Sequence, residues 1–192
     1  MYSLKLITAA ASTTPAISLE EAKAHLNITA NEYDDEVERK VASATRWCER
    51  NVSGHMQHMV ATWEWIANDF PCSAFTLPLP PLHSVVSVKY RSSTGSTHQA
   101  FASTNYITET PTDAPGWIEL KPDETWPSVY AVENAVKIQF KAGSTSSTGV
   151  SATAKEATKM VLDELWNQGH VRDEVKESVF SFLGCDEYGA YS

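Results

Sequence analysis

Four carboxylates within five residues are the first groups in this sequence that could do chemistry. Asp34, Asp35, Glu36 and Glu38 offer the oxygen ligands that hard cations such as Ca²⁺ and Mg²⁺ prefer. Their spacing lacks the Asp-x-Asp-x-Asp-Gly pattern of a calcium-binding loop. Acidic residues also favour the first turn of a helix, because they complement the positive end of its dipole. We therefore interpret the cluster as a helix start and rank a metal-dependent hydrolase last among the function hypotheses.

Histidine and cysteine side chains form the second candidate, a zinc site. His55 and His58 follow Cys48 closely, and Cys72 lies further along the chain. Structural zinc sites use paired spacings such as Cys-x₂₋₄-Cys, and none occurs here. Turn histidines that follow Gly54 are the simpler interpretation. We predict no metal and no other cofactor.

The sequence contains no recognisable catalytic or nucleotide-binding motif. It lacks a G-x-S-x-G nucleophile, a phosphate-binding loop and a dinucleotide-binding glycine pattern. Six tryptophans raise the alternative of a carbohydrate or small-molecule binding module, with Trp63 and Trp65 on one face of an expected strand. Large aromatic side chains more often belong to a core. We therefore predict a protein that is not an enzyme and keep the binding module as the alternative.

The charge balance argues against tight nucleic-acid binding. Among 192 residues, 24 acidic and 15 basic side chains give a formal net charge of −9. Proteins that grip a phosphate backbone usually carry a basic patch, whereas Arg46, Arg50, Lys137 and Lys141 are scattered among acids. No stretch approaches the ~20 apolar residues needed to cross a bilayer. With three cysteines in no paired pattern, we expect an intracellular protein without a membrane partner.

Helical patterns occupy the beginning and the end of the chain. Ser18 and Glu21 form a capping box for a short helix that ends at Asn27. Apolar residues then recur at spacings of three and four from Asn31 to Gly54, which predicts a longer helix. After a GSTSSTG linker at 143–149, the same spacing returns over 154–166 and again over 171–179. The tail FSFLGCDEYGAYS shows no packing period.

Between these helices the apolar residues recur at every second position, as in a β-strand, and no longer at helical spacing. A strand is expected over 59–67, and the proline-rich FTLPLPPLHSVVSVKY stiffens the crossing to the next strand at 86–90. Further strands are expected at 106–108, 117–121 and 136–141. The predicted fold class is therefore α+β. A small helical bundle formed by residues 1–57 and 143–192 carries residues 58–142 as an inserted antiparallel β-unit.

Several phrases along the chain occur in a characteristic order and spacing. The opening phrases are LKLIT, PAISLEEAKAHLNI and EYDDEVERKVASATRWCERNVSG. The β-rich part continues with TWEWIANDFP, LPLPPLHSVVSVKY, NYITET, PGWIELKP, a WP phrase and VKIQFKAG, and the helical phrase SATAKEATKMVLDELWNQ follows it. Together these phrases resemble the tailed-bacteriophage head–tail connector (adaptor) family, in its longer form with a β-rich insert. The resemblance covers residues 4–170 and extends to the adaptors of gene transfer agents.

The resemblance implies a structural virion protein. Such adaptors form a ring, commonly a dodecamer, beneath the portal, where it extends the DNA channel and joins the capsid to the tail or stopper. The implied partners are the portal protein, a stopper or tail-completion protein, further copies of the chain, and double-stranded DNA that passes without sequence-specific binding. The implied location is the virion neck at the portal vertex, after assembly in the cytoplasm of the host bacterium.

Two segments are candidate interaction sites. Aromatic side chains anchor interfaces, so the tail supplies a candidate portal interface of Phe180, Phe182, Leu183, Tyr188 and Tyr191. A disordered or self-packed tail is the alternative. The expected hairpin tip is a candidate loop facing the DNA path or the next tail component, formed by Ser92, Ser93, Thr94, Gly95, Ser96 and Thr97. An ordinary solvated turn is the alternative there.

Overall fold

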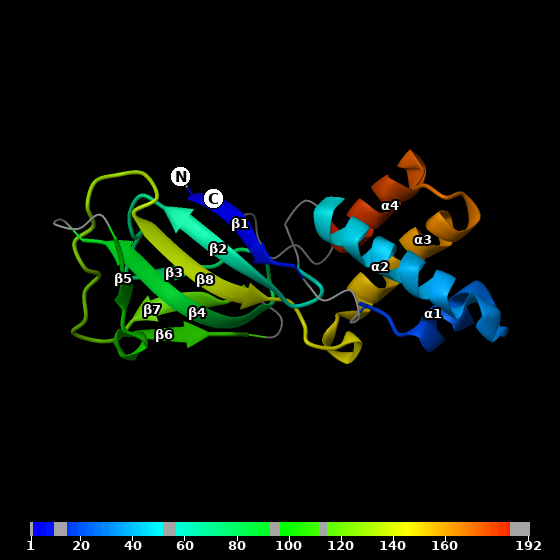
Figure 1. The fold of residues 1–192 in the computed structure, drawn as a ribbon, viewed down its shortest axis with the longest axis horizontal. Coiled ribbons are helices and arrows are strands. Elements are labelled where there is room, and N and C mark those ends of the chain that lie inside the picture. The colour runs from blue at the N-terminus through cyan, green and yellow to red at the C-terminus, as the bar shows by residue number, and fades with distance from the viewer. Residues whose placement is uncertain (1, 10–14, 52–56, 93–96, 112–114, 185–192) are drawn as a thin grey trace. The chain divides into compact units, whose positions relative to one another are not determined.

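The chain divides into two compact units, each built from two separate stretches of sequence. The computed structural model describes residues 2–9, 15–51, 57–92, 97–111 and 115–184 (Figure 1). Residues 1–10 and 60–143 form one unit, here called the β-unit. Residues 11–59 and 144–192 form the other, here called the helical unit. The expected α+β class, with helices and antiparallel sheets, is confirmed.

The β-unit contains two antiparallel sheets around one core. The larger sheet has the order β1-β2-β8-β4-β5 and the smaller has the order β3-β7-β6. Buried side chains from both sheets share a single cluster that includes Trp65, Val88, Phe140 and Ile118. The strands are β1 (Tyr2–Thr8), β2 (Ala61–Ala67), β3 (Ala74–Thr76), β4 (Leu82–Arg91), β5 (His98–Phe101), β6 (Tyr106–Glu109), β7 (Trp117–Leu120) and β8 (Val136–Ala142).

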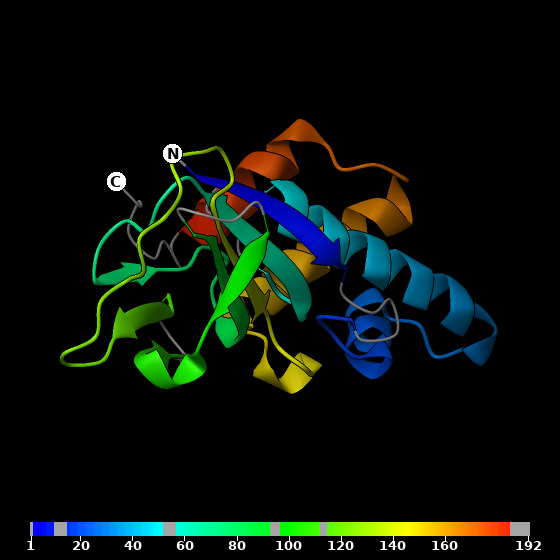
Figure 2. The same ribbon diagram turned by 60° about the vertical axis from the view of Figure 1, so that its left-hand side comes forward.

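The first strand corrects the expected domain boundaries. Residues 1–57 were assigned to the helical domain, but β1, blue in Figures 1 and 2, pairs with β2 from Tyr2↔Ala67 to Thr8↔Thr62. Tyr2 stacks on Trp65 at 5.8 Å between ring centroids, and Leu4 packs against the core of the β-unit. The N-terminal segment therefore completes the larger sheet.

The helical unit packs the apolar faces of its helices together. Its helices are α1 (Leu19–Leu26), α2 (Asp34–Asn51), α3 (Ala152–Asn167) and α4 (Asp173–Gly184), with short 3₁₀ turns at Asn31–Tyr33 and Ser147–Gly149 and a third, in the β-unit, at Ser103–Asn105. Val37, Val41, Ala44 and Cys48 of α2 are all buried, as their spacing predicts. They meet buried residues of α3 such as Val161. The expected linker at 143–149 contains an ordered 3₁₀ turn.

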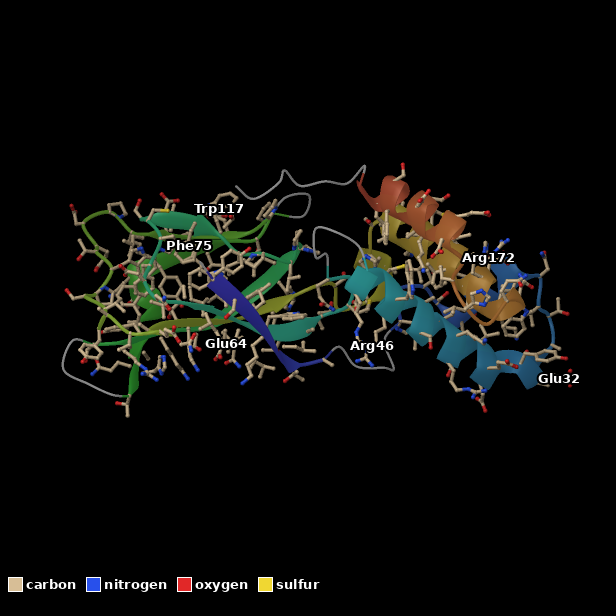
Figure 3. All side chains as sticks on the ribbon, turned by 90° about the horizontal axis from the view of Figure 1, so that it is seen from above. Glu32, Arg46, Glu64, Phe75, Trp117 and Arg172 are labelled. Carbon is tan, nitrogen blue, oxygen red and sulfur yellow. The ribbon has the colours of Figure 1, made fainter. Side chains whose placement is uncertain are left out.

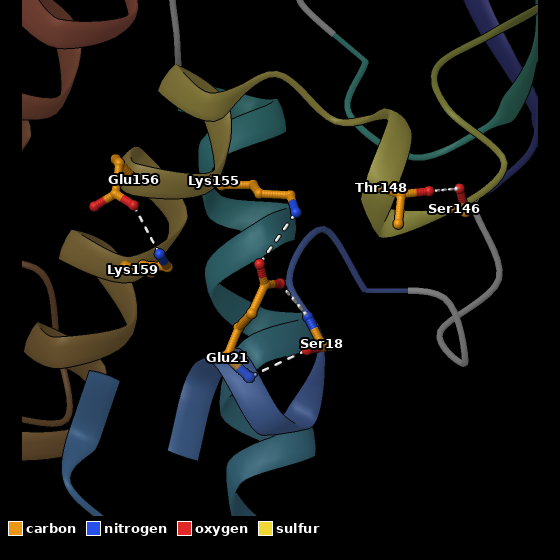
Figure 4. Close-up of polar contacts among 7 residues, drawn as sticks. All are labelled: Ser18, Glu21, Ser146, Thr148, Lys155, Glu156 and Lys159. Carbon is orange, nitrogen blue, oxygen red and sulfur yellow. Dashed lines mark hydrogen bonds and ion pairs between the residues drawn. The ribbon is translucent and has the colours of Figure 1, made fainter. Parts of the chain in front are cut away.

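Capping fixes where these helices begin. The Ser18 hydroxyl accepts a hydrogen bond from Glu21 N at 3.1 Å, and Ser18 N donates to Glu21 Oε2 at 3.0 Å (Figure 4). This confirms the capping box, and Asn27 ends α1 with a left-handed φ of 58°. Glu21 also pairs with Lys155 of α3 at 3.2 Å. The cap therefore ties the first helix to the third as well as starting it.

Candidate functional site

The acidic cluster at residues 34–38 lies at the start of α2. Asp34 forms an ion pair with Lys23 of α1 at 2.5 Å, and the neighbouring acids fill the first turn. Over the described residues, no three histidine, cysteine or acidic side chains come together as a metal site. The geometry therefore fits a dipole-stabilised helix start.

Two of the residues considered for zinc, Cys48 and His58, are buried in the helical unit. Burial raises the pKa of the Cys48 thiol to about 12 and lowers the pKa of the His58 imidazole to about 4. His55 lies outside the described residues, and Cys72 belongs to the β-unit, where its thiol donates to the carbonyl of Ala74.

Glu49, near the end of α2, forms hydrogen bonds with the chain at residues 57–59. Its Oε1 accepts from Gln57 Nε2 at 2.8 Å and from the backbone N of Met59 at 3.0 Å. Burial raises the pKa of the Glu49 carboxyl, and the backbone hydrogen bonds of Met59 and His58 partly oppose that rise. The carboxylate thus holds residues 57–59 against the end of α2.

Three of the four tryptophans of the β-unit belong to its core or pack against it. Trp65 is 4% exposed and lies between Tyr2 and Phe75, with ring centroids 5.8 and 5.5 Å away. Trp126 stacks on Phe70 at 4.3 Å, and its indole N–H donates to the carbonyl of Cys72. Phe75 and Trp117 are labelled in Figure 3. A sugar platform needs an open ring face, and both faces of Trp65 are covered.

The candidate portal interface separates into core and surface residues. Phe180 and Leu183 belong to α4, so this part of the tail does have a packing period. Leu183 is 2% exposed and is therefore buried in the helical unit, as the self-packed alternative expects for this residue. Phe180 is 36% exposed and stacks on Trp47 of α2 at 6.1 Å. Tyr188, Tyr191 and the side chain of Phe182 lie outside the described part of the chain.

The expected hairpin is confirmed by its two strands. Strands β4 and β5 pair antiparallel, ending at Arg91↔His98. Ser93, Thr94, Gly95 and Ser96 lie outside the described residues, so the tip itself stays a prediction. At its borders, Ser92 is half-buried and Thr97 is exposed.

A feature that the sequence analysis missed is a line of charges along α2 and the 3₁₀ turn that precedes it. Its exposed members lie on one side of the helix, with three acids first and three arginines after them. We call this set the charged stripe, and its members are Glu32, Asp35, Glu36, Arg39, Arg46 and Arg50. Figure 3 shows Glu32 and Arg46 at opposite ends of the helical unit. The signal was present in the same period that predicted the apolar face, but the acids were considered only as metal ligands.

Comparisons with known proteins point to one kind of particle. No protein-family model matches the chain, and no curated protein matches it. One similar solved chain is from the virion of a native gene transfer agent (GTA) particle, with a TM-score of 0.67, 16% identity and coverage of 93% of both chains. A second is from the neck of an empty GTA particle computed with C6 symmetry, with a TM-score of 0.65, 16% identity and coverage of 92% of this chain and 94% of the other.

A third similar chain extends the match to nearly every residue. It is from the neck of a native GTA particle computed with C12 symmetry, with a TM-score of 0.67, 15% identity and coverage of 99% of this chain and 97% of the other. None of the helices in the described ranges is long and apolar enough to span a membrane. This protein therefore has the α+β fold of a chain found in the neck of gene transfer agent particles.

Proposed function

We propose that this protein is a head–tail adaptor, a structural virion protein that forms a ring beneath the portal. The observation that carries the proposal is the likeness to virion and neck chains of gene transfer agent particles over 92–99% of the sequence. That coverage includes both units, so the likeness extends beyond a common helical bundle or a common β-sandwich. The C12 symmetry of one such neck supports a ring of twelve copies.

In this role the ring extends the DNA channel and joins the capsid to the tail or stopper. A net charge of −9 suits a wall along which DNA slides, because a strongly basic wall would bind the phosphate backbone. We propose assembly in the cytoplasm of the host bacterium and contact with the portal through α4. Phe180 is the exposed aromatic residue of that helix, beside Trp47. The hairpin tip between Ser92 and Thr97 is the proposed contact with the DNA path or the next tail component.

Deleting the gene tests this role directly. Electron micrographs of particles made without the protein should show filled or leaking heads separated from finished tails. Supplying the gene in trans should restore joined particles, which controls for damage to neighbouring genes. Normally joined particles in the deletion strain would exclude the adaptor role.

A further inference from the structure

The charged stripe lies on the face of α2 opposite the core. Its exposed members are spaced so that they follow one side of the helix, whereas the buried Val37, Val41 and Ala44 follow the other. The eighteen residues of α2 correspond to a length of about 27 Å. The stripe therefore presents an acidic half and a basic half on one elongated exposed surface.

The described part of the chain does not neutralise this surface. Elsewhere the described residues form six ion pairs, including Lys23–Asp34 and Lys155–Glu21, and none of the six involves a member of the stripe. Within the stripe, Arg39 Nε donates to the backbone carbonyl of Asp35, which leaves both charges unpaired. Arg46 attracts the partly buried Glu49 without forming an ion pair with it.

Helix electrostatics explain only part of this pattern. Acids in the first turn and Arg50 in the last turn complement the helix dipole. That effect falls off within one turn of each end. Arg39 and Arg46 lie further inside the helix, on the exposed side, and the dipole gives no reason for arginine there.

We propose that the stripe is a contact surface for a second copy of this chain, with the acidic half of one copy lying against the basic half of the next. This inference rests on the proposed ring. DNA would be repelled by the acidic half, and a partner of uniform charge would match only half of the surface. A second copy offers both signs, and this local attraction offsets the repulsion between chains that each carry a net charge of −9.

The polarity of the stripe suits a closed ring. Rotational rings need two unlike surfaces on every subunit, so that each copy contacts one neighbour with each surface. Here the acidic half serves one neighbour and the basic half serves the other. A back-to-back pair would satisfy both halves in one contact and would stop at two copies.

Charge reversal tests the contact. One variant carries Arg39→Glu, Arg46→Glu and Arg50→Glu, so its stripe is entirely acidic. The other carries Glu32→Lys, Asp35→Lys and Glu36→Lys, so its stripe is entirely basic. Each is supplied in trans to the deletion strain, and copies of the protein per particle are counted by quantitative mass spectrometry. We expect each variant alone to reduce incorporation about tenfold or more, because like charges then face each other.

Mixing the two variants gives the decisive result. Alternating acidic and basic subunits restore attraction at every contact, so co-expression should recover most of the incorporation of the natural chain. A matched control with Lys89→Glu, Lys121→Glu and Lys141→Glu changes the net charge as much as the acidic variant does, at exposed sites of the β-unit. The control should assemble normally.

Several results would overturn the contact. One is normal incorporation of either variant alone, and another is low incorporation of the control. A third is low incorporation of the mixture although circular dichroism shows both variants folded, and a fourth is a mixture that forms only pairs. If a variant does not fold, a variant with glutamine at the three arginine positions is tested instead. We expect it to be incorporated less than the natural chain, and normal incorporation would count against the contact. If the natural chain is itself missing from the neck, the proposed function fails instead.

Discussion

The buried His58 makes the stability of the helical unit depend on pH in a predictable direction. Its side chain is 4% exposed, and its Nδ1 has no hydrogen-bond partner among the described residues. Burial disfavours the charged imidazolium and lowers the pKa from 6.5 to about 4. The unfolded chain therefore takes up a proton in the range where the folded chain does not. The stabilisation is complete above pH 6.5 and is lost as the pH falls toward 4.

The size of the effect follows from the two pKa values. A difference of about 2.5 between them corresponds to roughly 3 kcal/mol of unfolding free energy below pH 4, and to about 2 kcal/mol at pH 5. Glu49 acts in the opposite direction, because its raised pKa favours the folded state as the pH falls. A variant of His58 alone separates the two contributions.

Urea denaturation followed by far-ultraviolet circular dichroism at pH 7.5 and pH 5.0 measures this dependence. Between pH 7.5 and pH 5.0, the unfolding free energy of His58→Gln should fall by about 2 kcal/mol less than that of the natural chain. His25→Gln is the matched control, because His25 is exposed on α1 and its replacement should leave the dependence unchanged. Equal pH dependence in His58→Gln and the natural chain would refute the reasoning.

Three further substitutions test packing, capping and docking. Phe140→Ala removes a fully buried side chain and should lower the unfolding free energy by about 3–5 kcal/mol, while Val86→Ala at a half-exposed site should change it by less than about 0.5 kcal/mol; similar losses in the two would contradict the assigned core. Ser18→Ala removes the capping box and should cost about 1 kcal/mol in the same denaturation assay. Phe180→Ala should weaken binding to the portal about tenfold in a pull-down titration, whereas the exposed Tyr33→Ala should not; unchanged binding of Phe180→Ala would remove that residue from the interface.

Local signals in the sequence were sufficient for the helices and for most strands. Ser18 and Glu21 lie three residues apart, so a single turn of chain contains the whole capping signal. The alternation of Val136, Ile138 and Phe140 is equally local, and all three are buried as expected. Such features need no knowledge of distant partners.

The errors arose where the partner lies far along the chain. Strand β1 is stabilised by β2, whose residues come more than fifty positions later, so the residues around Tyr2 do not show which strand they pair with. Leu183 was placed in a tail without a packing period, because the pattern of its neighbours did not show that α4 packs against α3. The charged stripe was overlooked for another reason. Its acids were judged as ligands for an ion, and their relation to arginines on the same face was not considered.

The interleaving of the two units has a consequence for synthesis on the ribosome. Strand β1 emerges first, and its partner β2 follows only after α1 and α2 have been made, a wait of several seconds at typical elongation rates. The helices α1 and α2 remain without their packing partners for longer, because α3 and α4 are the last elements to emerge. The β-unit is complete once β8 has been made, so it is the first of the two that can fold. A ribosome that stops after residue 143 would release a finished sheet pair joined to two helices whose apolar faces have no helices to cover them.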